Sequence, residues 1–144
     1  NAFALLQDRI KQEQVSTEVE DLSKFHVLAN DVRLEQVFIN LISNALDAMQ
    51  LSQHKRLKVY CQTDAANLNI HFSDTGSGID SDHLLQLFDP FFSTKDVGVG
   101  LGLGLTISYS IIKTMGGDLS ARNSASGAVF SIRLRAARKS DRSL

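Results

Sequence analysis

The chain has 144 residues, of which 43% are hydrophobic and 22% are charged, a composition typical of a single globular domain with a real core. Its net charge is −1 and its pI is about 6.5, which argues against a surface for nucleic acid or anionic membranes, since such surfaces are basic. The single cysteine, Cys61, excludes an internal disulfide. No apolar run reaches the roughly 18 residues that a membrane span needs.

Hydrophobic periodicity divides the chain into helices and paired strands. The predicted helices are 2–12, 31–51 after a cap at Asn30 or Asp31, and 105–115 before Gly116 and Gly117. The predicted strands are 14–20, 26–29, 55–63, 68–73, 119–122 and 128–134. Because antiparallel strand pairs are separated by helices, we expect a two-layer α/β sandwich with helices on one face, not a doubly wound parallel sheet.

Residues 98–108, GVGLGLGLTIS, alternate glycine with valine or leucine before a predicted helix. Glycine loses more conformational entropy on folding than other residues, but its bare backbone lets a phosphate approach the N–H groups closely. The chain contains no Gly-Lys pair, so this is not a P-loop, and the spacing does not fit the dinucleotide fingerprint either. The segment is either a mobile phosphate lid or a flexible loop before a buried helix.

The long helix has an apolar half and a polar stripe when it is projected at 100° per residue. The stripe contains Asn40, Asn44 and Asp47. Since Asn40 and Asn44 are four residues apart, their amide oxygens project together. Mg²⁺ binds through few protein oxygens and completes its shell with water and phosphates, so the pair is a candidate metal site. The alternative is a solvated helix face.

Two further segments contain candidate binding residues. DTGSGID, residues 74–80, follows a predicted strand, and a carboxylate at Asp74 can accept the exocyclic amine of adenine but not the carbonyl of guanine. The alternative is a turn that needs an aspartate and glycines for its geometry. LFDPFFSTK, residues 87–95, groups phenylalanines around the only proline, so it either anchors a loop to the core or hinges a lid that brings Thr94 and Lys95 to phosphate oxygens.

Five motifs in order resemble the ATP-binding domain of bacterial sensor histidine kinases, which shares a superfamily with Hsp90, type II topoisomerases and MutL. The motifs are NLISNALDA at 40–48, DTGSGID, LFDPFFSTK, GLGLGLTIS at 100–108 and GGDL at 116–119. The wording of the third and fourth motifs is similar to the nitrogen-regulatory and C4-dicarboxylate sensor kinases. The resemblance implies a Bergerat-type α/β sandwich, with a mixed sheet of about five strands covered on one face by about three helices.

The resemblance also implies a role for individual residues toward ATP and Mg²⁺. Asn44 becomes the principal metal ligand with Asn40 in support, and Lys95 joins these two as a catalytic residue. The implied nucleotide-binding residues are Asn44, Asp47, Ala48, Asp74, Gly76, Gly78, Ile79, Phe88, Thr94, Lys95, Gly98, Gly100, Leu101, Gly102, Leu103, Gly104 and Leu105. With the lid hinged by the glycines, we expect residues 93–103 to be poorly ordered without nucleotide.

Position 40 bears on the reaction class. Hydrolysing relatives have a glutamate there that activates water, and Asn40 cannot do so, which favours transfer of the γ-phosphoryl group to a histidine over hydrolysis. A non-catalytic adenine-nucleotide sensor is the other alternative. At Ala128, many relatives have a serine or threonine whose hydroxyl helps a water bridge to adenine, so either Ser73 or Ser126 substitutes or adenine is held less tightly.

In the family that the chain resembles, the phosphoacceptor histidine lies on a preceding helical dimerisation domain next to an acidic residue, and none of the four histidines here has that setting. The resemblance therefore implies an acceptor on a separate dimerisation domain, with a response regulator as the next partner. We expect 1–12 to be a linker helix remnant from that domain, 13–136 the catalytic domain and 137–144 a disordered tail. We expect the isolated domain to be monomeric, and its parent to be anchored in the bacterial inner membrane with this domain in the cytoplasm.

Overall fold

The computed structural model describes residues 2–20, 31–64, 66–88 and 102–135, without the side chains of Leu85 and Leu103. Its helices are α1 (Ala2–Gln12), α3 (Val32–Ala48) and α4 (Gly102–Thr114), with a short 3-10 helix η1 (Leu84–Gln86). Its strands are β1 (Ser16–Val19), β2 (Arg56–Thr63), β3 (Asn67–Ser73), β4 (Asp118–Asn123) and β5 (Ala128–Arg135). None of the helices in this part of the chain is long and apolar enough to cross a membrane.

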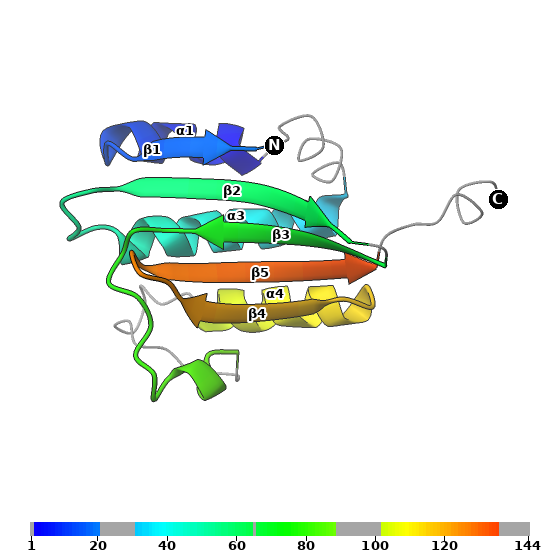
Figure 1. Ribbon diagram of the computed structural model, residues 1–144. Coiled ribbons are helices and arrows are strands. Elements are labelled where there is room, and N and C mark those ends of the chain that lie inside the picture. Colours follow the sequence, from blue (N-terminus) through cyan, green and yellow to red (C-terminus); the bar gives the residue numbers. More distant parts are fainter. Residues whose placement is uncertain (1, 21–30, 65, 89–101, 136–144) are drawn as a thin grey trace.

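The strands form one five-stranded sheet in the order β1-β2-β3-β5-β4. β1 pairs with β2 in parallel, and the other neighbouring pairs are antiparallel. The helices lie behind the sheet in Figure 1, and α3 packs between α1 and α4. The predicted two-layer sandwich with a mixed sheet is therefore confirmed. The sheet is mixed because β1 pairs with β2 in parallel.

The core lies between α3 and the covered face of the sheet. The helix presents its apolar half inward, where the Phe38 ring packs against Phe72 of β3 with ring centroids 5.7 Å apart. β2 and β3 alternate buried and accessible side chains, as expected for strands with one covered face. The Cys61 thiol is buried on that face. On α1, the apolar residues Phe3, Leu6 and Ile10 pack against the same core.

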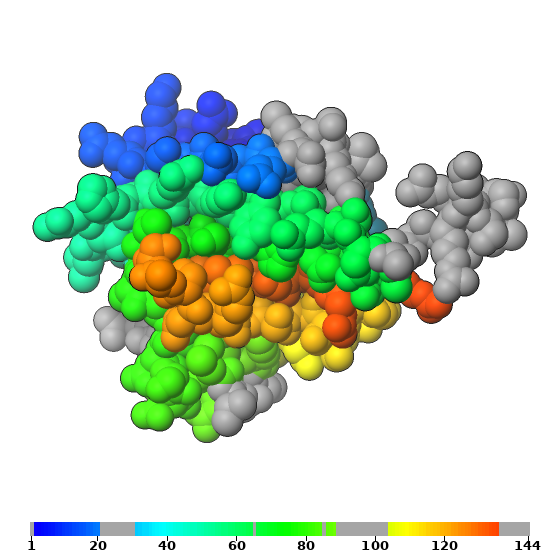
Figure 2. Space-filling view, in the orientation of Figure 1, coloured from blue at the N-terminus to red at the C-terminus, as the bar shows by residue number. Residues whose placement is uncertain are grey.

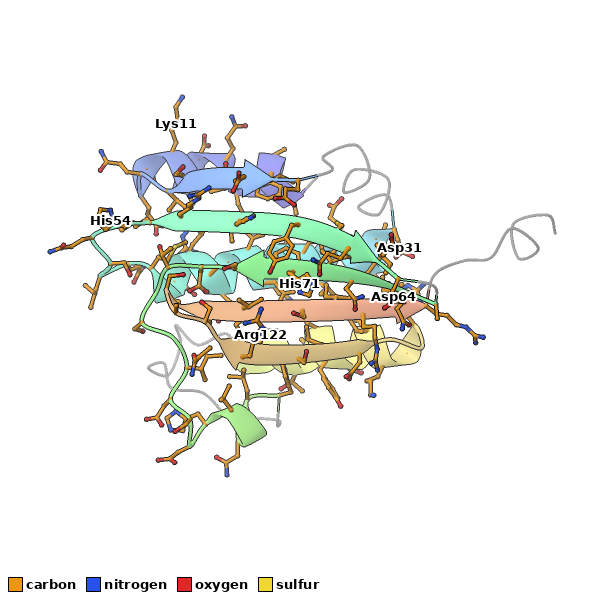
Figure 3. All side chains as sticks on the ribbon, in the orientation of Figure 1. Lys11, Asp31, His54, Asp64, His71 and Arg122 are labelled. Carbon is orange, nitrogen blue, oxygen red and sulfur yellow. The ribbon has the colours of Figure 1, made fainter. Side chains whose placement is uncertain are left out.

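The other face of the sheet is exposed over β2, β3, β5 and β4 (Figure 2). It carries polar and aromatic side chains, among them Tyr60, His71 and Ser131. Tyr60 and His71 place their rings 4.7 Å apart, and Lys58 Nζ lies 5.2 Å from the Tyr60 ring centroid. A hydrogen bond of 2.7 Å joins His71 Nδ1 to Ser131 Oγ. Partial burial, and then the nearby Arg122 guanidinium, lower the pKa of His71; both residues are labelled in Figure 3.

Two helix boundaries differ from the prediction. α3 ends at Ala48 rather than near Leu51, and α4 begins at Gly102 rather than Leu105. The low helix propensity of glycine predicts a loop at Gly102 and Gly104, but both residues are helical in the structure, where the following turn packs with Leu105 buried. The strand expected at 26–29 and the tail at 137–144 lie outside the described residues.

Candidate functional site

Asn40 joins α3 to the first turns of α4. Its Nδ2 donates to the Gly104 carbonyl at 3.3 Å and to Ser108 Oγ at 3.0 Å. Its Oδ1 accepts a hydrogen bond of 3.0 Å from Gln36 Nε2, one turn earlier on the same helix. Ser108 is completely buried. Both ends of the Asn40 amide are therefore engaged within the protein, and the residue fixes the helix that the glycine segment leads into.

Asn44 lies one turn further along α3 and is half-buried. In contrast to Asn40, its side-chain amide has no hydrogen-bond partner among the residues that the structure describes. An amide oxygen with no protein partner fits the small number of protein oxygens that Mg²⁺ takes. The structure thus distinguishes the two asparagines that the sequence grouped together: the Asn40 amide is engaged by the protein, whereas the Asn44 amide has no partner among the described residues.

Asp47 and Ala48, the last two residues of α3, contact two different parts of the chain. The Asp47 carboxylate accepts a hydrogen bond from the Arg9 guanidinium of α1. The Ala48 carbonyl lies against the DTGSGID loop, where a Cβ built on Gly76 would be only 2.6 Å from the Ala48 oxygen. Only glycine allows this close approach. The loop therefore packs directly on the turn of α3 that follows Asn44.

Asp74 is buried directly after β3, with 1% of its surface exposed. Its N–H donates to the Ala128 carbonyl at 3.0 Å, and its Oδ1 accepts from the Gly76 N–H at 2.9 Å and the Ala128 N–H at 3.3 Å. Burial raises the pKa of the Asp74 carboxyl, and these two backbone hydrogen bonds oppose that shift in part. No described residue donates to Oδ2, so this oxygen remains an acceptor for a ligand amine.

Asn123 holds the second half of the loop and was not identified from the sequence. From the end of β4, its Oδ1 accepts from the Ile79 N–H and its Nδ2 donates to the Ile79 carbonyl, both at 2.7 Å. The preceding Gly78 has a φ of +80°, which favours glycine. Sequence spacing gives no signal for this clamp, because Asn123 and Ile79 are brought together only by the packing of β4 beside the loop.

Gly127 was also missed, and it explains the backbone at position 128. A Cβ at Gly127 would lie 2.3 Å from the Asp74 carbonyl and 2.8 Å from Asp74 Oδ1. The missing side chain lets β5 approach Asp74 closely enough for the Ala128 hydrogen bonds. Ala128 is buried, Ser126 is exposed and Ser73 is half-buried. That one of these serines replaces the missing hydroxyl stays a prediction.

The described start of the third motif packs on α4 through Phe88. The half-buried Phe88 ring stacks on Tyr109 with centroids 5.3 Å apart and meets Phe130 edge-on at 6.5 Å. Thr106 Oγ1 donates to the Phe88 carbonyl at 3.3 Å. Phe88 thus anchors this segment to the core. The part of the expected lid up to residue 101 lies outside the described residues, so its expected disorder is not tested. The same holds for the predicted site residues Thr94, Lys95, Gly98, Gly100 and Leu101.

These contacts bring three parts of the chain to one site. α3 touches α4 through Asn40 and the DTGSGID loop through Ala48, and that loop is tied to β5 through Asp74. The site combines a buried carboxylate with an available oxygen (Asp74), an available helix amide (Asn44) and the N-terminus of α4, which begins with glycine. On this mixed-sheet sandwich, such a combination is typical of a nucleotide-binding domain.

The chain belongs to the family of histidine kinase-, DNA gyrase B- and HSP90-like ATPases, whose model matches residues 29–138. It is 47% identical over 114 residues to the sensor protein FixL of Bradyrhizobium diazoefficiens, covering 77% of this chain and 22% of that protein. It is 40% identical over 110 residues to the C4-dicarboxylate transport sensor protein DctB of Rhizobium meliloti, covering 76% of this chain and 17% of that protein. The predicted resemblance to sensor histidine kinases is confirmed.

Solved structures agree with the fold. The nucleotide-free catalytic domain of the histidine kinase ThkA superposes with a TM-score of 0.77 at 26% identity, covering 93% of this chain and 87% of that one. ThkA in complex with the response regulator protein TrrA superposes with a TM-score of 0.70 at 22% identity, covering 93% of this chain and 38% of that one.

Proposed function

We propose that this domain binds Mg·ATP and donates the γ-phosphoryl group to a histidine on a separate dimerisation domain of its parent protein, for relay to a response regulator. The observation that carries the proposal is Asp74, a buried carboxylate whose Oδ1 is fixed by two backbone donors while Oδ2 is left for a ligand. The ThkA complex with a response regulator supports the relay. We also propose that the parent is anchored in the inner membrane with this domain in the cytoplasm.

Asp74 supports selection of adenine. Adenine offers an exocyclic N–H donor to a carboxylate oxygen, whereas guanine has a carbonyl oxygen at the equivalent position and would face the carboxylate with a second acceptor. A buried polar group that is left unpaired costs the full desolvation of that group, so the wrong base is strongly disfavoured. Gly76 keeps the loop close to α3, and Asn123 holds Ile79 beside the proposed base site.

Asn44 fits a magnesium ion that accompanies the phosphates. When bound, Mg²⁺ would neutralise phosphate charge during transfer. Asn44 would hold it through its amide oxygen, which has no partner among the described residues. The N–H groups of the first turn of α4 add a site that favours anions. The glycines before α4 are proposed to contact the phosphates, as the family resemblance implies. Lys95 is proposed to contact them as a point charge from the neighbouring segment 87–95.

Asn40 favours transfer over hydrolysis. An asparagine amide is not a general base, and here it is held by Gly104, Ser108 and Gln36. No described group at this position can remove a proton from water, so the γ-phosphoryl group is kept for an acceptor histidine.

The test supplies a phosphoacceptor domain in trans, from a relative such as FixL or DctB, together with radiolabelled ATP and Mg²⁺. We expect label on the histidine of the acceptor domain and little phosphate release when the acceptor is omitted. Asp74→Asn serves as the negative control. Nucleotide binding with no label on histidine would favour the adenine-nucleotide sensor, and steady phosphate release from the domain alone would favour the hydrolase.

Asn44→Ala tests the metal ligand. Calorimetric titrations with ATP are compared in excess Mg²⁺ and in EDTA. We expect the variant to lose about tenfold in affinity in Mg²⁺, within the range for a lost charge-assisted contact, and to change little in EDTA. Val32→Ala, which alters an exposed side chain at the start of the same helix, is the matched control. An unchanged gain from Mg²⁺ in Asn44→Ala would remove Asn44 as a ligand.

A further inference from the structure

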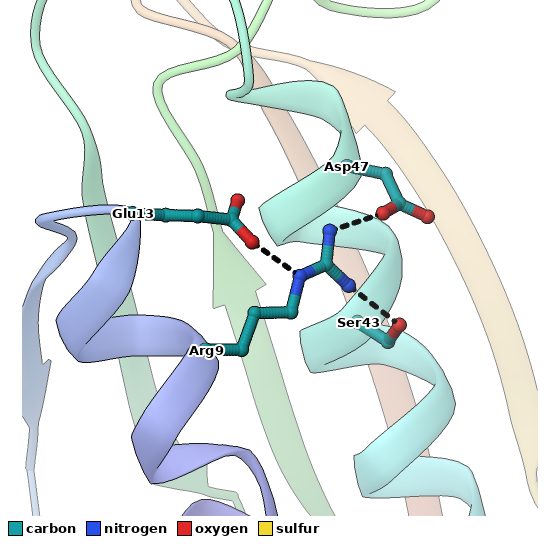
Figure 4. Close-up of polar contacts among 4 residues, drawn as sticks. All are labelled: Arg9, Glu13, Ser43 and Asp47. Atoms are coloured by element: carbon teal, nitrogen blue, oxygen red, sulfur yellow. Dashed lines mark hydrogen bonds and ion pairs between the residues drawn. The ribbon is translucent and has the colours of Figure 1, made fainter.

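Arg9 of α1 contacts three side chains, two of them on α3 (Figure 4). Its Nε donates to Glu13 Oε2 at 2.5 Å, one Nη donates to Ser43 Oγ at 3.2 Å, and the other Nη donates to an oxygen of Asp47. All three guanidinium nitrogens are therefore used. A planar fork that is bound at three points fixes the position of one helix against another better than a single contact does.

The charges around Arg9 are shielded from solvent. The side chains of Arg9, Glu13 and Asp47 are 27%, 22% and 20% exposed. Burial by itself would lower the pKa of Arg9, but hydrogen bonds to Asp47 and Glu13 raise it overall, so the residue stays charged. By comparison, the Arg56–Glu18 pair between β2 and β1 is 58% and 44% exposed, and exposed pairs of this kind contribute little.

The place of these contacts on α3 connects them to the nucleotide site. Ser43 and Asp47 lie one turn apart and enclose Asn44 in the sequence. Ala48, directly after Asp47, has its carbonyl against Gly76. On the neighbouring side of the helix, Asn40 binds α4. The C-terminal half of α3 is thus attached to α1 through Ser43 and Asp47 and to α4 through Asn40. Along the helix, Asn44 lies between Asn40 and Asp47.

We propose that Arg9 is a positioning residue for the nucleotide site, which sets the rotation of the last two turns of α3 so that the Asn44 amide faces the metal. This inference rests on the proposed function. It also gives Asp47 a role other than the expected contact with nucleotide, because its carboxylate serves Arg9. A displacement of α1 changes the metal affinity of the domain through this bridge, although none of the residues proposed to contact nucleotide or metal lies on α1.

The experiment compares Arg9→Gln with Arg56→Gln, which removes the exposed Arg–carboxylate pair as a matched control and leaves the Arg56 N–H bond to Thr75 in place. ATP is titrated calorimetrically in Mg²⁺ and in EDTA, and urea unfolding gives the stability of each variant. We expect Arg9→Gln to lower affinity in Mg²⁺ about tenfold, as changes behind a metal ligand typically do, and by less than twofold in EDTA. We expect Arg56→Gln to change neither affinity.

A second readout follows the Asn44 side chain directly. In NMR spectra of the nucleotide-free domain, the Asn44 side-chain amide signals, assigned by their loss in Asn44→Ala, should shift or broaden in Arg9→Gln and remain unchanged in Arg56→Gln. Arg9→Lys keeps the charge but not the fork, and should show a smaller effect in the same direction. If Arg9→Gln does not fold, Arg9→Lys carries the test.

The outcomes separate this inference from the proposed function. A variant that loses stability but keeps its affinity in Mg²⁺ and its Asn44 signals would make Arg9 merely structural and overturn the inference. Asp47→Asn combined with Arg9→Gln should add no further loss, since the two act as one unit; full additivity also overturns it. A wild-type domain that gains no affinity from Mg²⁺ contradicts the proposed function instead.

Discussion

Asp74 combines a binding role with an unfavourable position for a charge. The carboxyl is buried after β3, and burial raises its pKa in spite of two backbone hydrogen bonds. A folded-state pKa above the unfolded value means that the folded chain binds a proton more tightly than the unfolded chain does. The ionised form therefore opposes folding, and this effect is complete above the raised pKa and absent below the unfolded value.

Replacing Asp74 by Asn should separate binding from stability. The amide oxygen can still accept from Gly76 and Ala128, but its NH₂ group cannot accept from adenine, so we expect ATP affinity to fall at least tenfold. At neutral pH we expect the free energy of unfolding to stay equal or rise, and the difference from wild type to vanish as the pH falls below the ordinary carboxyl range. Urea unfolding at several pH values, beside ATP titrations, measures both.

Asp80→Asn is the control for this prediction, because Asp80 is an exposed carboxylate in the same loop. It should leave ATP affinity near wild type. Equal ATP affinity in wild type and Asp74→Asn would remove Asp74 from the base site.

At the level of elements, α3 begins with a well-formed cap. The Asp31 carboxylate accepts from the N–H groups of Arg33 at 2.9 Å and Leu34 at 3.4 Å. These bonds satisfy donors that a helix leaves unpaired at its first turn. The helix carries Asn40 and Asn44, so its start bears on the site as well as on the core.

We predict that Asp31→Ala lowers the free energy of unfolding by about 1 kcal/mol, the usual effect of losing such a cap. Asp31→Asn keeps an acceptor oxygen and should lose clearly less. Hydrogen bonds, first of all with the Arg33 side chain, lower the pKa of Asp31. The contribution of the ionised carboxylate to the free energy of unfolding is therefore present above the ordinary carboxyl pKa and is lost as the pH falls through the lowered pKa. A loss in Asp31→Asn equal to that in Asp31→Ala would assign the effect to charge and not to the cap.

The sequence predicted elements with a clear period better than contacts between elements. α3 and the β2–β3 hairpin follow from apolar spacing that reports one covered face. The start of α4 did not follow, because glycine propensity favours a loop at Gly102 and Gly104 and only the packing of the completed fold makes them helical. The Asn123–Ile79 clamp and the Arg9–Asp47 bridge join residues far apart in the chain, so no local pattern predicts them.

For the whole molecule, binding and stability are linked. A ligand that binds only the folded chain stabilises it by about 2.7 kcal/mol at 100 times its dissociation constant. For a domain of this size that corresponds to roughly 5–10 °C in melting temperature. We predict such a shift with Mg·ATP in a thermal unfolding experiment and little shift with Mg·GTP, since Asp74 cannot pair with guanine. Equal shifts for both nucleotides would contradict adenine selection.

The bond between Asp74 and Ala128 has a consequence for synthesis of the chain. The site needs Asn44 from an early helix, Asp74 from the middle and the backbone of β5, which is the last strand of the sheet. A growing chain on the ribosome therefore cannot hold the Asp74 carboxylate in place until β5 has emerged. Nucleotide binding therefore requires the complete sheet, and chains that end before residue 128 should not bind ATP.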